Sequence, residues 1–594
     1  MSCDGNTKIS AKKLYSILTK KKNEIAAQSP IYLFQKDFTE GTYIIDKPGY
    51  YILKENIIFS PNPDNDYLPK YNNPKYQTLG FSLGFFACII IAAKDVYLDL
   101  NNKTISGSDQ FVLQQRFFSI IELADAPFIP SQGPGNFGST IKSAENTIIA
   151  NGTLGKSSHH GIHANLANNI LLENLKIHSF EVAGIALNGG HCMVLNNVEI
   201  ANSKTDVPIL GTYSAARFAK LFVKHILSKN ILAEDAKAEL NRRLNILQQE
   251  IDQTFSEAMS NERISSDLFR NETKLPDGNV YGVLIKNEGF AVNDYVNASE
   301  IKTKGKKRTL NIFLHKVKVK NLNCKVIEIP ALSAKGGKGA TTDVAGAVLQ
   351  IDRITQNGKY VGTALSNLQL YLAQLSINYK IPLGKNNISQ EIISWANSGD
   401  DISVLLKKGY KYKLGGDVMA HFCKAIQAFR FDALENVYMK KCSFENVTNH
   451  GYLGNDKLLG NYSRSHDEAK RNGYFGADST GINVSYCSDV KISKCDFSGV
   501  HSKHGNAIGL NVIFESDVTL NKCKFEDIKA GTLEGKNWKG IDYSGETVKY
   551  SDGSPNKIPR SIGIFIEKKS VVEMDSTDIR DLRSPSSDIK IFKE

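Results

Sequence analysis

Hydrophobic and polar residues alternate along most of this chain in one recurring unit of two strands. Each unit opens with a small residue, and an apolar residue follows nine positions later, inside the second strand. Alternation of this kind points one face of a strand inward, so the pattern predicts strands rather than helices. The pairs are Ala87 and Val96, Gly161 and Ile170, Gly184 and Met193, Ala428 and Val437, Gly481 and Val490, Gly509 and Val518, and Gly563 and Val572.

The second strand is the most regular part of the unit, because its inward positions repeat Val, Ile, Leu, Met, Cys and Phe at a fixed spacing. Weaker copies of the same spacing begin at Ile170, Ile312 and Val572. A single unit cannot cover its own apolar face, whereas stacked units cover one another. The clearest copies are Val437, Met439, Cys442, Phe444 and Val447, then Val490, Ile492, Cys495, Phe497 and Val500, then Val518, Leu520, Cys523, Phe525 and Ile528.

The distance between copies predicts a parallel β-solenoid. Gly161 and Gly184 are 23 residues apart, which is the length of one coil of a β-solenoid rather than of a helical repeat. Cys442 and Cys495 are 53 residues apart, so we expect this gap, and the similar gap after Cys523, to hold two coils each. Paired asparagines beside the strands predict tight turns, because Asn tolerates left-handed backbone angles. These pairs are Asn101-Asn102, Asn168-Asn169 and Asn196-Asn197.

This pattern resembles the right-handed parallel β-helix, or pectin-lyase-like, superfamily over about residues 40–590. The resemblance implies an all-β solenoid with an N-terminal helix and with helical and loop insertions. Segments that begin at Gly84, Leu98 and Gln115 also resemble β-helix proteins encoded by giant DNA viruses.

Composition shifts divide the chain into a solenoid and its insertions. Residues 1–28 are predicted to form a helix that caps the N-terminal end of the solenoid, since exposed strand edges invite aggregation. The stripe from Leu240 to Met259 has helical spacing. The expected parts are 1–28 as the capping helix, 29–203 as the first part of the β-helix, 204–280 as a helical hairpin, 281–329 as a further coil, 330–427 as a loop and helix insertion, and 428–594 as the last part of the β-helix.

The start of the chain gives no secretory signal, because residues 1–28 are rich in Lys and amphipathic. The longest apolar run, 85–93, is too short for a membrane span, which needs about 20 residues. We therefore expect a protein made in the cytoplasm without membrane insertion. The net charge of +11 lies in short clusters without interleaved aromatic residues, so no nucleic-acid partner is expected.

The nine cysteines suggest packing rather than disulfides. Cys442, Cys495 and Cys523 occupy one equivalent inward position in three copies of the unit, where a small apolar side chain fits. No Cys/His spacing indicates a zinc site. The sequence predicts no cofactor.

Enzymes of the resembled superfamily cleave acidic polysaccharides, either by hydrolysis between carboxylates or by elimination with a base and often calcium. The nearest match is Asp400-Asp401, preceded by Gly399. The remaining motifs of a polygalacturonase are missing, and Asp-Asp after Gly is also an ordinary turn sequence. The outward acidic positions Glu445 and Asp496 belong to no uniform acidic column.

Histidines are the other candidates for chemistry. His160 lies in a cluster with His159 and His163 around Gly161, and His504 lies with His501 before Gly509. Stacked coil corners of this kind can build an acid/base or metal site. The alternative is that these side chains fill loops and cap turns. His191, His450 and His466 are further members of the candidate set.

A clear scaffold without a complete catalytic set favours a non-catalytic structural or surface-recognition protein, with a virion as its expected location given the giant-virus likeness. Such a rod is expected to form homo-oligomers or to bind other structural proteins, with glycans as a further class of partner. The alternative is a polysaccharide lyase or glycoside hydrolase that acts on an acidic glycan, because the fold alone does not decide the function.

Overall fold

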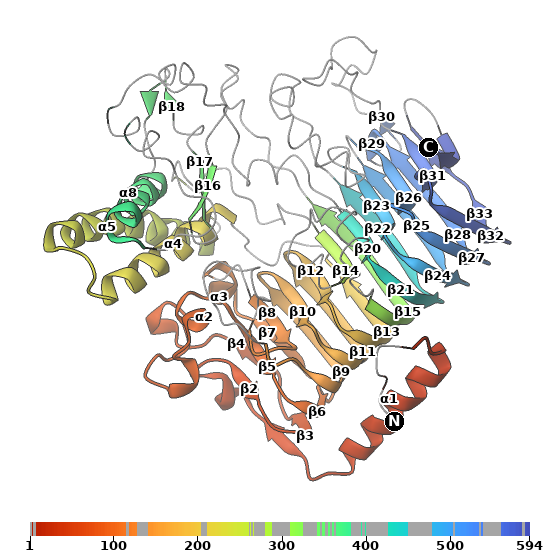
Figure 1. Cartoon of the computed structure of the whole chain (residues 1–594), viewed down its shortest axis with the longest axis horizontal. Helices are drawn as coiled ribbons and strands as arrows, with labels where there is room; N and C mark the ends of the chain where they lie inside the picture. The colour runs from red at the N-terminus through yellow and green to blue at the C-terminus, as the bar shows by residue number, and fades with distance from the viewer. Residues whose placement is uncertain are drawn as a thin grey trace.

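The computed structural model describes residues 3, 7–114, 118–126, 141–202, 211–260, 280–287, 309–324, 364–381, 426–449, 478–502, 505–533, 560–584 and 588–594, with a few shorter pieces between them. In these residues, parallel strands stack into two long sheets around one apolar interior (Figure 1). The larger sheet has 18 strands and the smaller sheet has 11. The chain is thus an all-β parallel solenoid, which confirms the sequence prediction.

The strands alternate between the two sheets along the chain. The larger sheet contains β1 (Ile31–Leu33), β3 (Gly49–Leu53), β4 (Ile57–Phe59), β6 (Lys94–Asp99), β7 (Thr104–Gly107), β9 (Glu145–Ser157), β11 (Asn168–Phe180), β13 (His191–Ala201), β15 (Thr309–Cys324), β21 (Leu434–Lys440), β22 (Ser443–Asn449), β24 (Ser488–Ser493), β25 (Asp496–Ser502), β27 (Asp517–Asn521), β28 (Lys524–Ala530), β32 (Val571–Asp575), β33 (Asp578–Ile579) and β34 (Leu582–Arg583). The smaller sheet contains β2 (Tyr43–Ile45), β5 (Phe86–Ile91), β8 (Phe118–Glu122), β10 (His160–Asn165), β12 (Ala183–Asn188), β14 (Val280–Lys286), β20 (Ile426–Asp432), β23 (Ser479–Ser485), β26 (Ala507–Ile513), β31 (Ser561–Ile566) and β35 (Asp588–Lys593).

Equivalent residues of successive rungs pair directly, so like side chains stack inside the solenoid. Phe444 pairs with Phe497, which pairs with Phe525, and the ring centroids are 4.9 and 5.1 Å apart. Their side chains are at most 2% exposed and belong to one continuous core. Burial of each such side chain contributes about 1.5–3 kcal/mol, so every rung stabilises its neighbours.

The long gaps between copies contain one rung each, and the expectation of two coils is wrong. Ser443 pairs directly with Asp496, and Lys524 pairs directly with Asp578. No additional strand is therefore interposed between these strands of the larger sheet.

The glycines of the repeat are required by close packing across the solenoid. A Cβ atom at Gly509 would lie 2.6 Å from the backbone oxygen of Gly563 and 3.0 Å from the side chains of Phe525 and Ile528. The same conflict with the next rung occurs at the other glycines of this column. Ala87 is the exception among the small residues, because it aligns with the position of His160, one residue before the glycine column.

Asn101-Asn102 forms a turn between β6 and β7, as predicted, whereas Asn169 lies within β11 and Asn197 lies within β13, where each bends the strand instead of ending it. Asn101, Asn102, Asn169 and Asn197 have φ values of 49°, 58°, 57° and 54°. Asn can hydrogen-bond locally in this left-handed region, which costs other side chains more. The corners of successive rungs therefore repeat Asn without a glycine.

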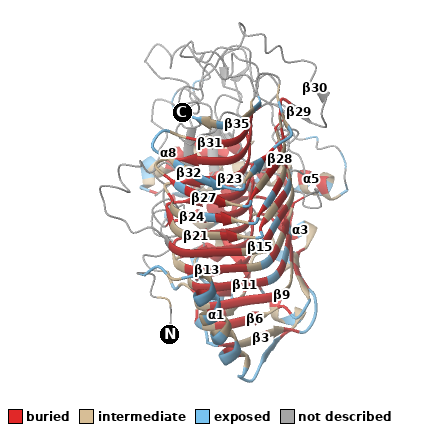
Figure 2. Cartoon of the chain, turned by 90° about the vertical axis from the view of Figure 1, so that its right-hand side faces the viewer, coloured by how far each residue is buried: buried red, intermediate tan, exposed pale blue. Residues whose placement is uncertain are grey.

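The N-terminal helix α1 (Ala11–Ala26) does not cap the end of the solenoid, so this expectation is wrong. It lies across the outer face of the larger sheet, over β3, β6, β9, β11 and β13 (Figures 1 and 2). Leu14, Leu18 and Ile25 are buried there against apolar residues that these strands turn outward, among them Ile148 and Leu171. An amphipathic helix buries its stripe wherever an apolar surface is available, and this surface lies on the flank.

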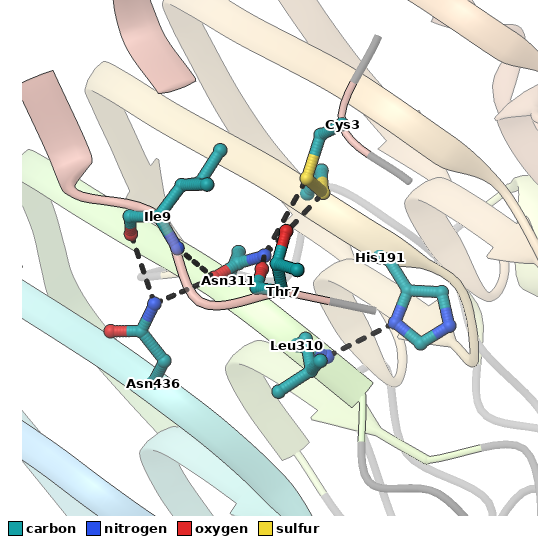
Figure 3. The surroundings of a disulfide bond; sticks show 8 residues. Cys3, Thr7, Ile9, His191, Leu310, Asn311 and Asn436 are labelled. Carbon is teal, nitrogen blue, oxygen red and sulfur yellow. Dashed lines mark hydrogen bonds between the residues drawn. A yellow bond between two sulfur atoms is a disulfide. The ribbon is translucent and has the colours of Figure 1, made fainter. Parts of the chain in front are cut away.

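A disulfide joins Cys3 to Cys192, which contradicts the expectation that the cysteines only pack. Cys192 is the second residue of β13, and Figure 3 shows Cys3 and the N-terminal segment at the disulfide. The predicted packing role does hold for Cys442, Cys495 and Cys523, which are free and buried in the core.

Three helices form a second apolar cluster beside the solenoid: α4 (Gly211–Ser228), α5 (Glu234–Met259) and α8 (Ala364–Tyr379). Lys220 of α4 forms an ion pair of 2.7 Å with Asp66 in the loop after β4, and the lysines and Arg217 nearby hold the pKa of Asp66 at about 2.

Among the described residues, no helix is long and apolar enough to cross a membrane. The remaining short helices are η1 (Gln35–Phe38), η2 (Pro63–Asn65), η3 (Pro74–Tyr76), α2 (Leu79–Ser82) and α3 (Asp109–Gln114).

Replacing Gly509 by Val should lower the free energy of unfolding by about 3 kcal/mol, because the new side chain overlaps backbone of the next rung as well as core side chains. Urea denaturation followed by circular dichroism measures this loss. The control is Ser498→Ala in β25, which should stay within about 0.5 kcal/mol. Equal midpoints for both variants would contradict the packing role of the glycine column.

Candidate functional site

Strands β8, β10, β12, β14 and β20 bring polar residues together on the outer face of the smaller sheet. His163 lies between Glu122 and Ala186 in the strand register, and Asn165 lies beside Asn188. Lys286 and Asp432 continue the Asn188 position on the next two strands. All these polar side chains are buried, so their interactions take place away from bulk water.

Glu122 and Asn188 hold His163 in one orientation. The Nδ1 atom of His163 lies 2.8 Å from both carboxylate oxygens of Glu122, and its Nε2 atom lies 2.9 Å from the amide nitrogen of Asn188. A carboxylate accepts and an amide nitrogen donates, so this geometry assigns the proton to Nδ1 and the lone pair to Nε2. Both ring nitrogens are therefore occupied within the protein.

His160 is a buried titratable group of this face, and 7% of it is exposed. Its ring stacks on the ring of His159 with centroids 4.0 Å apart and meets the ring of His163 edge-on at 5.0 Å. Burial lowers the pKa of His160 well below the usual value, and the neighbouring histidines and Lys286 lower it further. Its Nδ1 atom makes no hydrogen bond to the described part of the chain. His160 is therefore neutral at pH 7.

The three histidines form a continuous row between two carboxylates. At one end Nδ1 of His159 lies 3.8 Å from Glu181, and at the other end His163 binds Glu122. We refer to these five residues as the histidine row. Within the row, the three rings contact one another through stacked and edge-on packing.

A second buried group lies on β14 and β20. Arg430 donates from Nε to Asp432 at 2.7 Å and from Nη1 to the hydroxyl of Tyr281 at 3.0 Å. The charge of Asp432 is thus balanced by a residue of its own strand. The carboxylate of Asp432 is therefore already bound by a cation of the chain itself.

Glu122 and Asp432 are too far apart to act together as the carboxyl pair of a glycosidase. Glu122 and Asp432 lie on β8 and β20, which are four strand spacings or about 19 Å apart. Glycoside hydrolases of the usual kind place their two carboxyl groups about 5–10 Å apart. Within the described residues, no group of three or more His, Cys, Asp or Glu side chains can hold a metal ion.

Two other predicted histidines that the structure describes, His191 and His501, lie apart from His160. His191 accepts from the backbone N–H of Leu310 at 3.1 Å at the edge of the larger sheet (Figure 3). His501 binds Asp527 at 3.0 Å on β25 and β28. His504, Asp400 and Asp401 lie outside the described residues, as do His450 and His466.

In the described part of the larger sheet, the outward column through Asp496 alternates in charge, so it is not an acidic column, as the sequence indicates. Asp496 pairs in register with Lys524, and Lys524 pairs with Asp578. Glu526 is contacted by Lys524 at 2.6 Å and by Arg580 at 3.0 Å. The negative charge of each of these carboxylates is therefore balanced by a basic neighbour or solvated by water.

The sequence analysis identified the histidines but missed Glu122 and Asn188, which bind His163, and the separate pair of Arg430 and Asp432. One signal was present, because the sequence Phe429-Arg-Phe-Asp places two charged residues within a run of otherwise apolar character. Charged residues that alternate with core residues inside a strand must find partners on the outer face.

No protein-family model and no curated protein matches the sequence. Two solved structures are similar in fold. The first, ORF18 of Geobacillus virus E2, has a TM-score of 0.31 and 9% identity over 98% of this chain, which spans 61% of the viral protein. The second, the endo-xylogalacturonan hydrolase of Aspergillus tubingensis, has a TM-score of 0.32 and 8% identity over 99% of this chain and 92% of the hydrolase. Neither likeness assigns an activity, and the fold follows from the strand register itself.

Replacing His160 by Asn should flatten the acid side of the stability profile. The folded chain disfavours the proton on His160, whereas the unfolded chain binds it below about pH 6.5. The free energy of unfolding of the parent protein is therefore retained above about pH 6.5 and falls as the pH decreases below it. Urea midpoints measured between about pH 8 and pH 5 give the slope.

The matched control for this experiment is His178→Asn, which changes an exposed imidazole on β11. This variant should keep the slope of the parent protein. If the slope of His160→Asn also equals that of the parent protein, burial of His160 is not the source of the acid sensitivity.

Proposed function

We propose that this protein is a rigid, non-catalytic structural or surface-recognition component. The observation that carries this proposal is the N-terminal segment, which fastens rungs that are far apart in the sequence. In a solenoid each rung contacts only its neighbours, so stability is a sum of local terms. A segment that crosses many rungs adds a coupling that the stack alone lacks.

The first described residues of this segment bind the middle of the larger sheet. Lys8 forms ion pairs of 3.0 Å with Glu435 and 3.3 Å with Asp489. The backbone of Ile9 donates to the side chain of Asn311 and accepts from that of Asn436 (Figure 3). These residues belong to β15, β21 and β24, which are successive strands of the sheet. The disulfide to Cys192 adds β13.

Helix α1 continues the same path toward the first rungs. Tyr15 donates to Glu173 at 2.5 Å and Lys22 pairs with the same carboxylate at 2.8 Å. Lys21 pairs with Asp95 at 2.9 Å. These polar contacts lie beside the buried leucines of α1 and join the helix to the strands that it covers. We refer to residues 3–26 as the strap, which reaches from β24 to β3.

The state of the polar groups also supports a non-catalytic role. Glu122 and Asp432 are each bound by a cation or an imidazole of the chain itself. Catalytic carboxylates of a hydrolase must instead bracket a bond of the substrate. Location in a virion and binding to host glycans remain proposals that rest on the sequence resemblance.

The second candidate is a lyase or hydrolase for an acidic glycan, and the histidine row is the observation that favours it. A neutral, buried His160 is chemically able to act as a base. The two candidates differ in a direct assay. If the protein is non-catalytic, incubation with pectate, alginate and xylogalacturonan should give no new reducing ends and no unsaturated products, which are detected by their ultraviolet absorbance.

A product in this assay that disappears in both His160→Ala and His163→Ala would overturn the non-catalytic proposal. A product that both variants retain would also overturn it and would place the chemistry elsewhere. Thermal melting of the variants checks that each remains folded under the assay conditions.

The role of the strap predicts a second result. Leu18 of α1 is buried against the larger sheet, so Leu18→Ala should lower the free energy of unfolding by about 3 kcal/mol. Hydrogen exchange should increase in the strands β6, β9 and β11, which the helix covers. The control is Lys20→Ala on the exposed face of the same helix, which should change neither quantity. Unchanged exchange in Leu18→Ala would contradict the coupling role of the strap.

A further inference from the structure

The last rung leaves the apolar interior of the solenoid open. Met574 and Ile591 occupy the inward positions of Leu520 and Ile564 in the register. Leu520 and Ile564 are 0% exposed, whereas Met574 and Ile591 are 41% and 40% exposed. Figure 2 shows the same change along the stack, because the last strands lose the continuous buried colour of the strands before them.

The first rung is closed by comparison. Leu33 of β1 and Ile45 of β2 are each 1% exposed, and Phe38 of η1, also 1% exposed, belongs to the same core. The two ends therefore differ in kind. Exposed core positions beside unpaired strand edges are a template for a further strand.

Strand β35 is the edge of the smaller sheet at the open end. It pairs with β31 along one side, and no described strand pairs with its other side. Phe592 stacks on Phe565 at 5.4 Å, so the strand is held firmly in place while its outer edge stays available.

Two of the three cross-strand pairs that β35 would form with a second, antiparallel copy of itself are complementary, and the third sets Lys590 opposite Ile591. A two-fold axis between Lys590 and Ile591 would place Asp588 opposite Lys593 of the other copy. The same register places Ile589 opposite Phe592, which is an aliphatic and aromatic pair on the outer face. Opposite charges and apolar pairs directly across a ladder are the favourable cross-strand combinations.

We propose that two copies of this chain associate end to end through β35 as an isologous antiparallel pair, which closes the core of each copy with the last rung of the other. A two-fold contact of this kind uses the same surface on both copies and stops at two. The inference goes beyond the proposed function and does not depend on it, since a structural protein and an enzyme would dimerise in the same way.

Sedimentation velocity of the full chain at about 1–100 μM tests the proposal. The parent protein should sediment as a dimer. Asp588→Lys and Lys593→Asp each place like charges opposite one another twice in the interface, so each should weaken dimerisation at least tenfold. The double variant Asp588→Lys/Lys593→Asp restores the opposite charges and should return to within about threefold of the parent.

The matched control is Lys568→Asp, which makes the same charge change on an exposed residue of this rung outside β35. It should leave the dimer intact. Both substituted positions of β35 are exposed, and thermal melting confirms that the variants fold. A parent protein that is monomeric throughout, a dimer that both single variants retain, a double variant that stays monomeric, or assemblies larger than two would each overturn the proposal.

Discussion

Direct stacking of equivalent side chains is the constraint on which this structure depends. Parallel pairing puts each residue above its counterpart in the next rung, so a position is inward or outward in every rung at once. Phe444, Phe497 and Phe525 satisfy it inside the core. At Gly509 the same constraint excludes a side chain, because the backbone of the next rung occupies that space. A residue of unsuitable size or polarity therefore disturbs the packing with both the preceding and the following rung.

The same constraint acts on the outer faces with a different result. Stacked charges of one sign repel, so the outward columns of the larger sheet alternate Asp496, Lys524 and Asp578. On the smaller sheet the outward positions are buried, where an unpaired charge costs more. There the chain uses the neutral His160 and closed pairs such as Arg430 and Asp432. The histidine row is thus an expected product of polar residues on a buried, stacked face.

The repeat could be read from the sequence because its information is local. Alternation within one strand and a fixed spacing to the next define the inward residues, and they lie in the core as predicted. Only the histidines of the candidate site could be predicted from the sequence, because the contact of His163 with Glu122 depends on which strand lies next to β10. The disulfide joins residues 189 positions apart, and no local pattern carries such a pairing.

The position of the N-terminal helix escaped prediction for a related reason. Its apolar stripe shows that Leu14, Leu18 and Ile25 are buried, but it does not say against what. The deciding feature is on the partner surface, where Ile148, Leu171 and further apolar residues face outward from a sheet whose outer positions are polar elsewhere.

Apolar residues on an outer face therefore indicate a covering segment even when the segment itself is not identified. The same logic, applied to the exposed inward residues of the last rung, is what distinguishes the two ends of the solenoid.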